Sequence, residues 1–384
     1  MIPENIVEIF NRAMKDKGKY ISTDVLPSPM KQLLIRYQNR CEHLLKFDKK
    51  RLPLMPNVHF GYLDNYSLNA VAFIEDDYWF IGMNVGTILV IFSCFQRMLA
   101  DPEILPSIGN IKNEERQSPT EIYWNTDFFE LVKHNSSNLK APKDETRQNY
   151  AQLLTDIAID FLFHHEFTHL AHGHVSWLGK TENLPYITEF ETVDNNSQNL
   201  SNTYKITRQM LEYDADSGAV SRAWEELSYR VNNKLELPKG YRPFYETLYD
   251  AIYTWEFSIS SLFLLFDTKP INANTLYNCY HPQVTIRSFS VLATMLEHLL
   301  RNNLFEEELY EEMSGRILTD LRVSFEKTTS FHAEEEYQLN LYKITNPRNV
   351  YYEERIKYEE TILARWKTLR PELMPLAHGI KLAP

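Results

Sequence analysis

The stretch HHEFTHLAHGH, residues 164–174, decides how the rest of the chain is interpreted. It holds five of the chain's twelve histidines and contains the HExxH motif His165-Glu166-x-x-His169. Residues four apart on an α-helix lie on one face, a turn apart, so both imidazoles can bind one Zn²⁺ while Glu166 reaches a water on that ion. HExxH is short enough to occur by chance, so a zinc site also needs a third ligand.

The histidine stretch lies at the C-terminal end of a predicted helix. Apolar residues, among them Leu154, Ala158 and Leu162, recur at helical spacing from about residue 146, and Gly173 stands where a helix takes a left-handed cap. We therefore expect one helix over residues 146–172. The same spacing predicts further helices near 202–227, 244–267 and 282–302.

The third ligand is not supplied by the histidines that follow the motif. A metzincin would continue as HExxHxxGxxH, but this chain has His172 in place of the glycine and Val175 in place of the last histidine. His172 shares a face with His169 and could support it from outside the metal shell, although a structural or solvent-facing histidine is the favoured interpretation. The third ligand is therefore expected from a distant segment.

The segment QMLEYDADSGAV, residues 209–220, supplies a carboxylate pair. Glu212 and Asp216 are four apart and share one face of the predicted helix. We expect Glu212 to bind zinc and Asp216 to accept a hydrogen bond from the free ring N–H of a ligating histidine. Small residues nearby, Gly218 among them, would let this helix approach the histidine helix closely.

A third segment, HPQVTIRSFSVL, begins at His281 and supplies two more polar side chains. Pro282 is typical of a helix start, and Arg287 follows about two turns later. His281 and Arg287 are therefore candidate donors to an oxyanion or to a substrate carbonyl.

The three motifs, HExxH at 165–169, ExxAD at 212–216 and HPxxxxR at 281–287, occur in the order found in gluzincin metallopeptidases of the HtpX and CAAX prenyl protease type, and the chain resembles that group. Those enzymes usually span membranes several times. NAVAFIEDDYWFIGMNVG, residues 69–86, followed by the histidines, resembles the soluble phage-exclusion peptidases of the Lit group more closely. That resemblance implies a zinc-dependent antiviral defence protease that cleaves a host protein, elongation factor Tu in the known case, when phage triggers it.

Composition limits the partners and the cellular compartment expected for the chain. A formal charge of −12 and a pI near 5.5 disfavour nucleic acid as a partner. Three cysteines without CxxC spacing argue against a disulfide framework or a thiolate metal site, and the N-terminus lacks the order of a signal peptide, so a cytoplasmic protein is expected. Residues 78–96 carry no charge and approach membrane-spanning length. Polar interruptions favour a soluble interpretation, with membrane association and oligomeric state left open.

The expected fold class is α+β, mostly α. We predict a helical N-terminal segment over 1–65 broken by prolines, a zincin-like domain over 66–304 with a small antiparallel sheet, and a helical C-terminal extension over 305–384 whose acidic runs are solvated helix faces. The strand around residues 79–83 is a candidate edge for pairing with an extended substrate peptide.

The lead hypothesis is a zinc-dependent metalloendopeptidase acting on a protein or peptide. Its site residues are Glu166, His281 and Arg287 for catalysis, Asp216 as support, and His165, His169 and Glu212 as zinc ligands. Two alternatives stay open: a structural or regulatory zinc protein whose site His172 closes, and a binding module in which HExxH is accidental. Metal analysis combined with a protease assay separates the three.

Overall fold

A computed structural model describes residues 4–26, 28–115, 140–189, 201–266, 276–277, 279, 281–302, 350–380 and 382–383. The chain is mostly helical, with one small mixed sheet. In the described residues the α-helices and strands are α1 (Glu4–Ala13), β1 (Tyr20–Ile21), α2 (Ser28–Arg51), β2 (Val58–Leu63), β3 (Ala70–Glu75), β4 (Tyr78–Asn84), α3 (Val85–Leu99), α5 (Glu145–Ala171), α6 (His174–Glu182), β5 (Tyr186–Thr188), α7 (Asn202–Asn232), α8 (Leu248–Phe266), α10 (Val284–Arg301) and α13 (Val350–Leu373).

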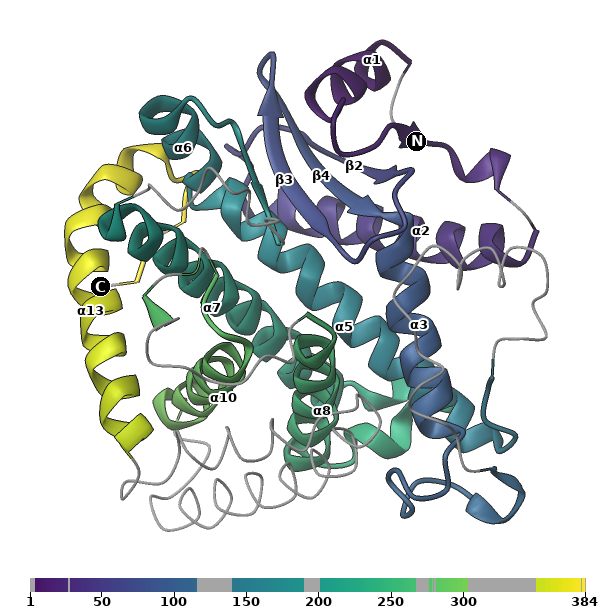
Figure 1. The fold of residues 1–384 in the computed structure, drawn as a ribbon. Coiled ribbons are helices and arrows are strands. Elements are labelled where there is room, and N and C mark those ends of the chain that lie inside the picture. The colour runs from purple at the N-terminus through teal and green to yellow at the C-terminus, as the bar shows by residue number, and fades with distance from the viewer. Residues whose placement is uncertain are drawn as a thin grey trace.

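The helix that the apolar spacing predicted over residues 146–172 is α5, and it is the central element of the fold. It crosses the middle of the molecule, with the sheet on one side and α7 and α8 on the other (Figure 1). Asp144 caps its N-terminus by accepting the backbone N–H of Arg147 at 3.1 Å. At the other end the chain leaves the helix through Gly173, whose φ of 82° is the left-handed conformation that glycine adopts without steric cost.

The sheet contains the predicted hairpin and three strands that were not predicted. Its order is β1-β2-β4-β3-β5, with β2 and β4 parallel and the other pairs antiparallel. The hairpin turn passes through Asp76 and Asp77, both at positive φ, as a type I′ turn requires. Because β4 lies between β2 and β3, residues 79–83 are not an edge, and that part of the prediction is wrong. In the described chain the edges are β1 and β5.

Both faces of the sheet are covered, which explains why its strands are almost continuously apolar. On one face, Phe10 of α1 packs against Phe73 and Phe80, with ring centroids 5.1 and 5.5 Å apart. On the other face, alternate residues such as Ala72 and Ile81 join the main core around α3 and α5. Strand β2 was missed because it has no polar outward face whose alternation would have revealed it.

The N-terminal segment over 1–65 is not the series of short helices that its prolines suggested. Helix α2 runs unbroken from Ser28 to Arg51. Pro29 lies in its first turn, where a backbone N–H has no intrahelical partner and proline costs nothing. Strand β2 pairs with β4, so the predicted boundary at 65/66 falls inside the sheet.

The predicted C-terminal extension is described only from residue 350, and the acidic run HAEEEYQ lies outside the described residues. Helix α13 packs along α7 and its end reaches α6. Its inward face is apolar and buried, and that face contains Tyr358, Ile362, Trp366, Leu369 and Leu373. The run YYEERIKYEE is thus only partly a solvated face.

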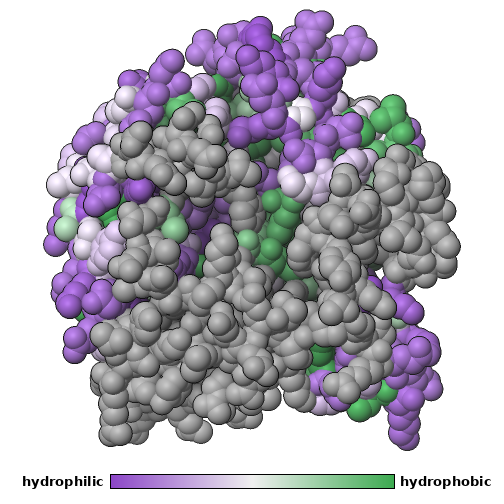
Figure 2. Space-filling model, viewed as in Figure 1, coloured by the Kyte–Doolittle hydropathy of each residue, from purple (hydrophilic) through white to green (hydrophobic). Residues whose placement is uncertain are grey.

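The apolar stretch over residues 78–96 divides between strand β4 and helix α3. Among the described residues, no helix has the length and apolar character needed to cross a bilayer. The described surface in the view of Figure 2 is mostly hydrophilic around its margin, and apolar side chains reach the surface near the middle of that face.

Candidate metal centre

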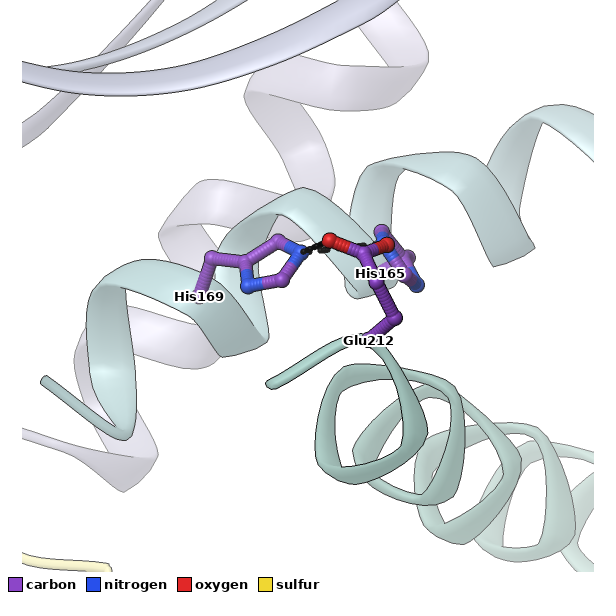
Figure 3. Close-up of side chains that lie close together, drawn as sticks. All are labelled: His165, His169 and Glu212. Atoms are coloured by element: carbon purple, nitrogen blue, oxygen red, sulfur yellow. Dashed lines mark hydrogen bonds and ion pairs between the residues drawn. The ribbon is translucent and has the colours of Figure 1, made fainter. Parts of the chain in front are cut away.

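The structure brings the three sequence motifs to one place. His165 and His169 project from adjacent turns of α5, with their Nε2 atoms 3.0 Å apart. Glu212 reaches them from α7, with Oε2 3.3 Å from Nε2 of His165 and Oε1 3.6 Å from Nε2 of His169 (Figure 3). All three side chains are buried and can offer ligand atoms to one ion.

These distances fit zinc. Ligand atoms about 2.0–2.1 Å from a tetrahedral ion lie about 3.3–3.4 Å from one another, and the separations among the three side chains are 3.0, 3.3 and 3.6 Å. Neither carboxylate oxygen of Glu212 has a hydrogen-bond partner in the described chain, although both are buried. Buried oxygens that face two ring nitrogens without a hydrogen bond are what a shared cation requires.

Close packing of α5 on α7 makes this approach possible. Gly218, six residues beyond Glu212 on α7, faces Thr168 on α5. A Cβ added at Gly218 would lie 2.5 Å from both Cγ2 and Oγ1 of Thr168. The expectation that a small residue brings the carboxylate helix near the histidine helix is therefore confirmed at this position.

Asp216 supports His165 from the side away from the ligand atoms. Its Oδ1 lies 2.9 Å from Nδ1 of His165, which is the contact expected from the sequence. Arg287 holds the same carboxylate through two hydrogen bonds, Nε to Oδ2 at 2.9 Å and Nη2 to Oδ1 at 2.8 Å. Burial alone would raise the pKa of Asp216, but Arg287 and His165 lower it.

Arg287 is therefore placed differently from the donor that the sequence suggested. Besides Asp216 it binds Glu189 through Nη1, and its guanidinium stacks over Phe263 with 4.7 Å to the ring centroid. The side chain is buried with its donors directed at these two carboxylates. This geometry favours a positioning role for Arg287 over contact with a substrate oxygen.

His169 has a support that sequence reasoning missed. Its Nδ1 lies 2.9 Å from Nδ1 of His174, whose Nε2 lies 3.0 Å from Oδ2 of Asp214. With Nε2 of His169 facing an ion, its Nδ1–H donates to His174, and Nε2–H of His174 donates to the carboxylate. His172 contacts the same oxygen of Asp214 through Nδ1, so it does not belong to the predicted ligand group.

Two further carboxylates lie beside the ligand atoms. Both carboxylate oxygens of Glu166 are buried, and neither has a hydrogen-bond partner in the described chain. Burial raises the pKa of this carboxyl well above its usual range. Glu189, which no motif indicated, follows β5 and places Oε2 3.1 Å from Nε2 of His165. Burial alone would lower the pKa of His165, but Glu189, Asp216 and Glu212 raise it well above its usual value.

His281 lies at the rim of the group. Its side chain is 19% exposed, and Nδ1 is 3.3 Å from Oε2 of Glu212. Burial alone would raise the pKa of Glu212, but His281, His169 and His165 hold it well below its usual range. His281 is thus placed where its side chain could face both Glu212 and an entering molecule.

In comparisons with known proteins, the chain matches no family model, no curated protein and no solved structure. Any function proposed for the site therefore depends on the sequence motifs and on the geometry described above.

Proposed function

We propose that the chain is a zinc-dependent metalloendopeptidase of the gluzincin type, with His165, His169 and Glu212 as zinc ligands. The observation that carries this proposal is the unpaired carboxylate of Glu166 beside three converging ligand atoms. A purely structural metal site has no use for a buried glutamate without a partner, whereas hydrolysis requires a base at this position.

The residues of the chain supply the proton transfers. Zinc held by His165, His169 and Glu212 would supply Lewis-acid chemistry, lowering the pKa of a water and polarising a substrate carbonyl. Glu166 accepts the proton of the attacking water and delivers one to the leaving amine. Its raised pKa, caused by burial, suits a group that holds a proton between these steps.

The surroundings of the site favour an extended peptide as substrate. Strand β5 pairs with β3 on one side and has no second partner strand in the described chain, so its outer edge can pair with a peptide backbone. We assign this role to β5 in place of β4. His281, partly exposed beside Glu212, is the candidate donor to the substrate carbonyl.

The order of the three motifs also supports a proposal about the biological role of the chain. Its resemblance to phage-exclusion peptidases supports a defence role in which the substrate is a host protein. A zinc protein without hydrolytic activity is the second candidate, and a further buried carboxylate favours it, because Oε2 of Glu189 lies 3.1 Å from Nε2 of His165.

Two measurements on the full chain test the proposal. Elemental analysis of the purified protein should give about one zinc per chain, removable by chelation. Newly formed peptide termini should then be compared in phage-challenged cells that express the wild type or Glu166→Gln. Glu166→Gln keeps its zinc but lacks the base, so only the wild type should generate new termini. A metal-free folded protein, or identical termini in both cultures, would exclude the peptidase.

A further inference from the structure

A second group of possible ligand atoms lies where α5 meets α6. It consists of His172, which follows the last residue of α5, His174, the first residue of α6, and Asp214 of α7. Both histidines contact one oxygen of Asp214, His174 through Nε2 at 3.0 Å and His172 through Nδ1. One atom from each of the three side chains lies within 4.8 Å of the other two, so the three can share one ion.

Gly173 is the reason that both histidines reach the same carboxylate. In a continuous helix, positions 172 and 174 would lie about 200° apart around the axis and face opposite sides. The φ of 82° at Gly173 breaks the helix between them and turns both side chains toward Asp214. Two imidazoles and a carboxylate, brought together in this way, are ligands typical of Zn²⁺ and similar divalent ions.

This group is less enclosed than the proposed zinc site. The side chain of His172 is 11% exposed, whereas those of His165 and His169 are 0% and 2% exposed. An ion can therefore reach His172 from solvent, and water can complete its coordination there.

One hydrogen bond joins this group to the zinc site. Nδ1 of His169 and Nδ1 of His174 are 2.9 Å apart, so one of them donates and the other accepts. A neutral imidazole that donates from Nδ1 has an unprotonated Nε2, which can bind a metal ion. One that accepts at Nδ1 carries its proton at Nε2 and cannot. The direction of this hydrogen bond therefore decides which histidine can bind an ion through Nε2.

Each direction suits one of the two groups. When His169 donates, its Nε2 can bind zinc, and the Nε2–H of His174 donates to Asp214. When His174 donates, its Nε2 can bind an ion together with His172 and Asp214, and Nε2 of His169 carries the proton. Both arrangements hold the same number of protons, so exchange between them needs no net proton uptake or release.

We propose that His172, His174 and Asp214 form a second metal site, and that this site and the zinc site exclude each other. The exclusion rests on the proposed function, because it requires His169 to be a zinc ligand. The second site should bind zinc more weakly, because an ion there replaces two hydrogen bonds that Asp214 accepts. Neither oxygen of Glu212 has such a bond to lose in the described chain.

Calorimetric titration of the metal-free, full-length protein with Zn²⁺ tests the proposal. Glu212→Gln keeps the size of the side chain but removes a ligand of the zinc site, and His165→Gln does the same where the first variant folds poorly. His172→Gln, combined with either variant, removes the second site. His43→Gln is the matched control, because His43 is exposed and belongs to none of the possible metal-ligand groups in the described chain.

We expect the wild type to bind one Zn²⁺ per chain and to take up no second ion on further titration. Glu212→Gln should bind one ion at least about a hundredfold more weakly, because two charge-assisted hydrogen bonds are given up, and dialysis should remove that ion. Adding His172→Gln to this variant should abolish the weak binding, whereas adding His43→Gln should not.

The remaining outcomes separate the second site from the peptidase. A Glu212→Gln protein that folds but binds no ion overturns the second site and leaves the zinc site of the wild type intact. Weak binding that survives His172→Gln also overturns it. Two ions bound at once by the wild type overturn the exclusion. A wild type that binds no zinc refutes the proposed function itself.

Discussion

Each candidate ligand histidine has its own carboxylate support, and removing either support should weaken metal binding. Asp216 contacts His165 directly, whereas Asp214 reaches His169 through His174. Replacing either aspartate with asparagine keeps its size but removes the charge that fixes the tautomer and raises the basicity of the ligand. Outer partners of this kind change metal affinity about 10–100-fold, or ~1.4–2.7 kcal/mol.

Asp214 and Asp216 support different histidines, but Nε2 of His165 and Nε2 of His169 lie 3.0 Å apart, so the effects of Asp214→Asn and Asp216→Asn on zinc binding should be coupled and should not simply multiply. The single variants differ in one respect. Asp216→Asn also leaves Arg287 with Glu189 as its remaining carboxylate partner, so the metal-free protein should lose about 3 kcal/mol of stability.

Competition with a fluorescent zinc chelator at fixed pH measures the dissociation constants for zinc. Thermal unfolding of the metal-free proteins then distinguishes a loss of folding stability from a loss of zinc affinity. His172→Gln is the matched control, because His172 contacts Asp214 but lies outside the path to His169. An unchanged dissociation constant for Asp214→Asn would show that His174 only packs against His169. A His172→Gln variant as weak as Asp214→Asn would show that the contacts act through local folding.

Four further outcomes follow from the structure. Glu166→Gln should keep about one zinc per chain while hydrolysis falls by orders of magnitude, as measured by elemental analysis and termini profiling. Glu212→Ala should lose stoichiometric zinc, because two histidines leave the tetrahedron half built; full retention would move the third ligand elsewhere. Gly218→Ala should push α7 from α5 and weaken zinc binding, and Thr168→Ala in the same chain should restore part of the loss, since it removes both atoms at 2.5 Å. Burial raises the pKa of Glu256 to about 8 from 4.5, so the native state binds the extra proton and its stability falls as pH rises toward 8. Denaturant unfolding from about pH 5.5 to 7.5 should show Glu256→Gln gaining ~2.7 kcal/mol relative to wild type, and a constant difference would contradict this pKa.

The parts of the site that sequence predicted are those encoded locally. HExxH and ExxAD each place two functional side chains one helical turn apart, so a correct helix assignment places them on one face. The meeting of both helices could also be anticipated, because Gly218 removes the side chain that would keep them apart. Asp216 was recognised as a support because its spacing from Glu212 is itself helical.

The parts that were missed depend on the path of the chain between elements. Glu189 follows a three-residue strand, too short for alternation to be visible, and it reaches the site only because β5 pairs with β3. His174 contacts His169 because Gly173 turns the chain sharply before α6. The mixed sheet was missed for a related reason, since β2 is covered on both faces and pairs in parallel with β4 across a distance in sequence.

The end of the histidine helix is completed by a segment far downstream. His378 donates its backbone N–H to the carbonyl of Ala171 at 2.9 Å, and a Cβ on Gly173 would lie 2.6 Å from Cβ of Leu376. During synthesis, a chain that has emerged through the HPxxxxR motif already contains every proposed zinc ligand but still lacks these contacts, which lie roughly ninety residues later. Docking of the downstream segment therefore completes the hydrogen bonding at the end of the helix that presents His169.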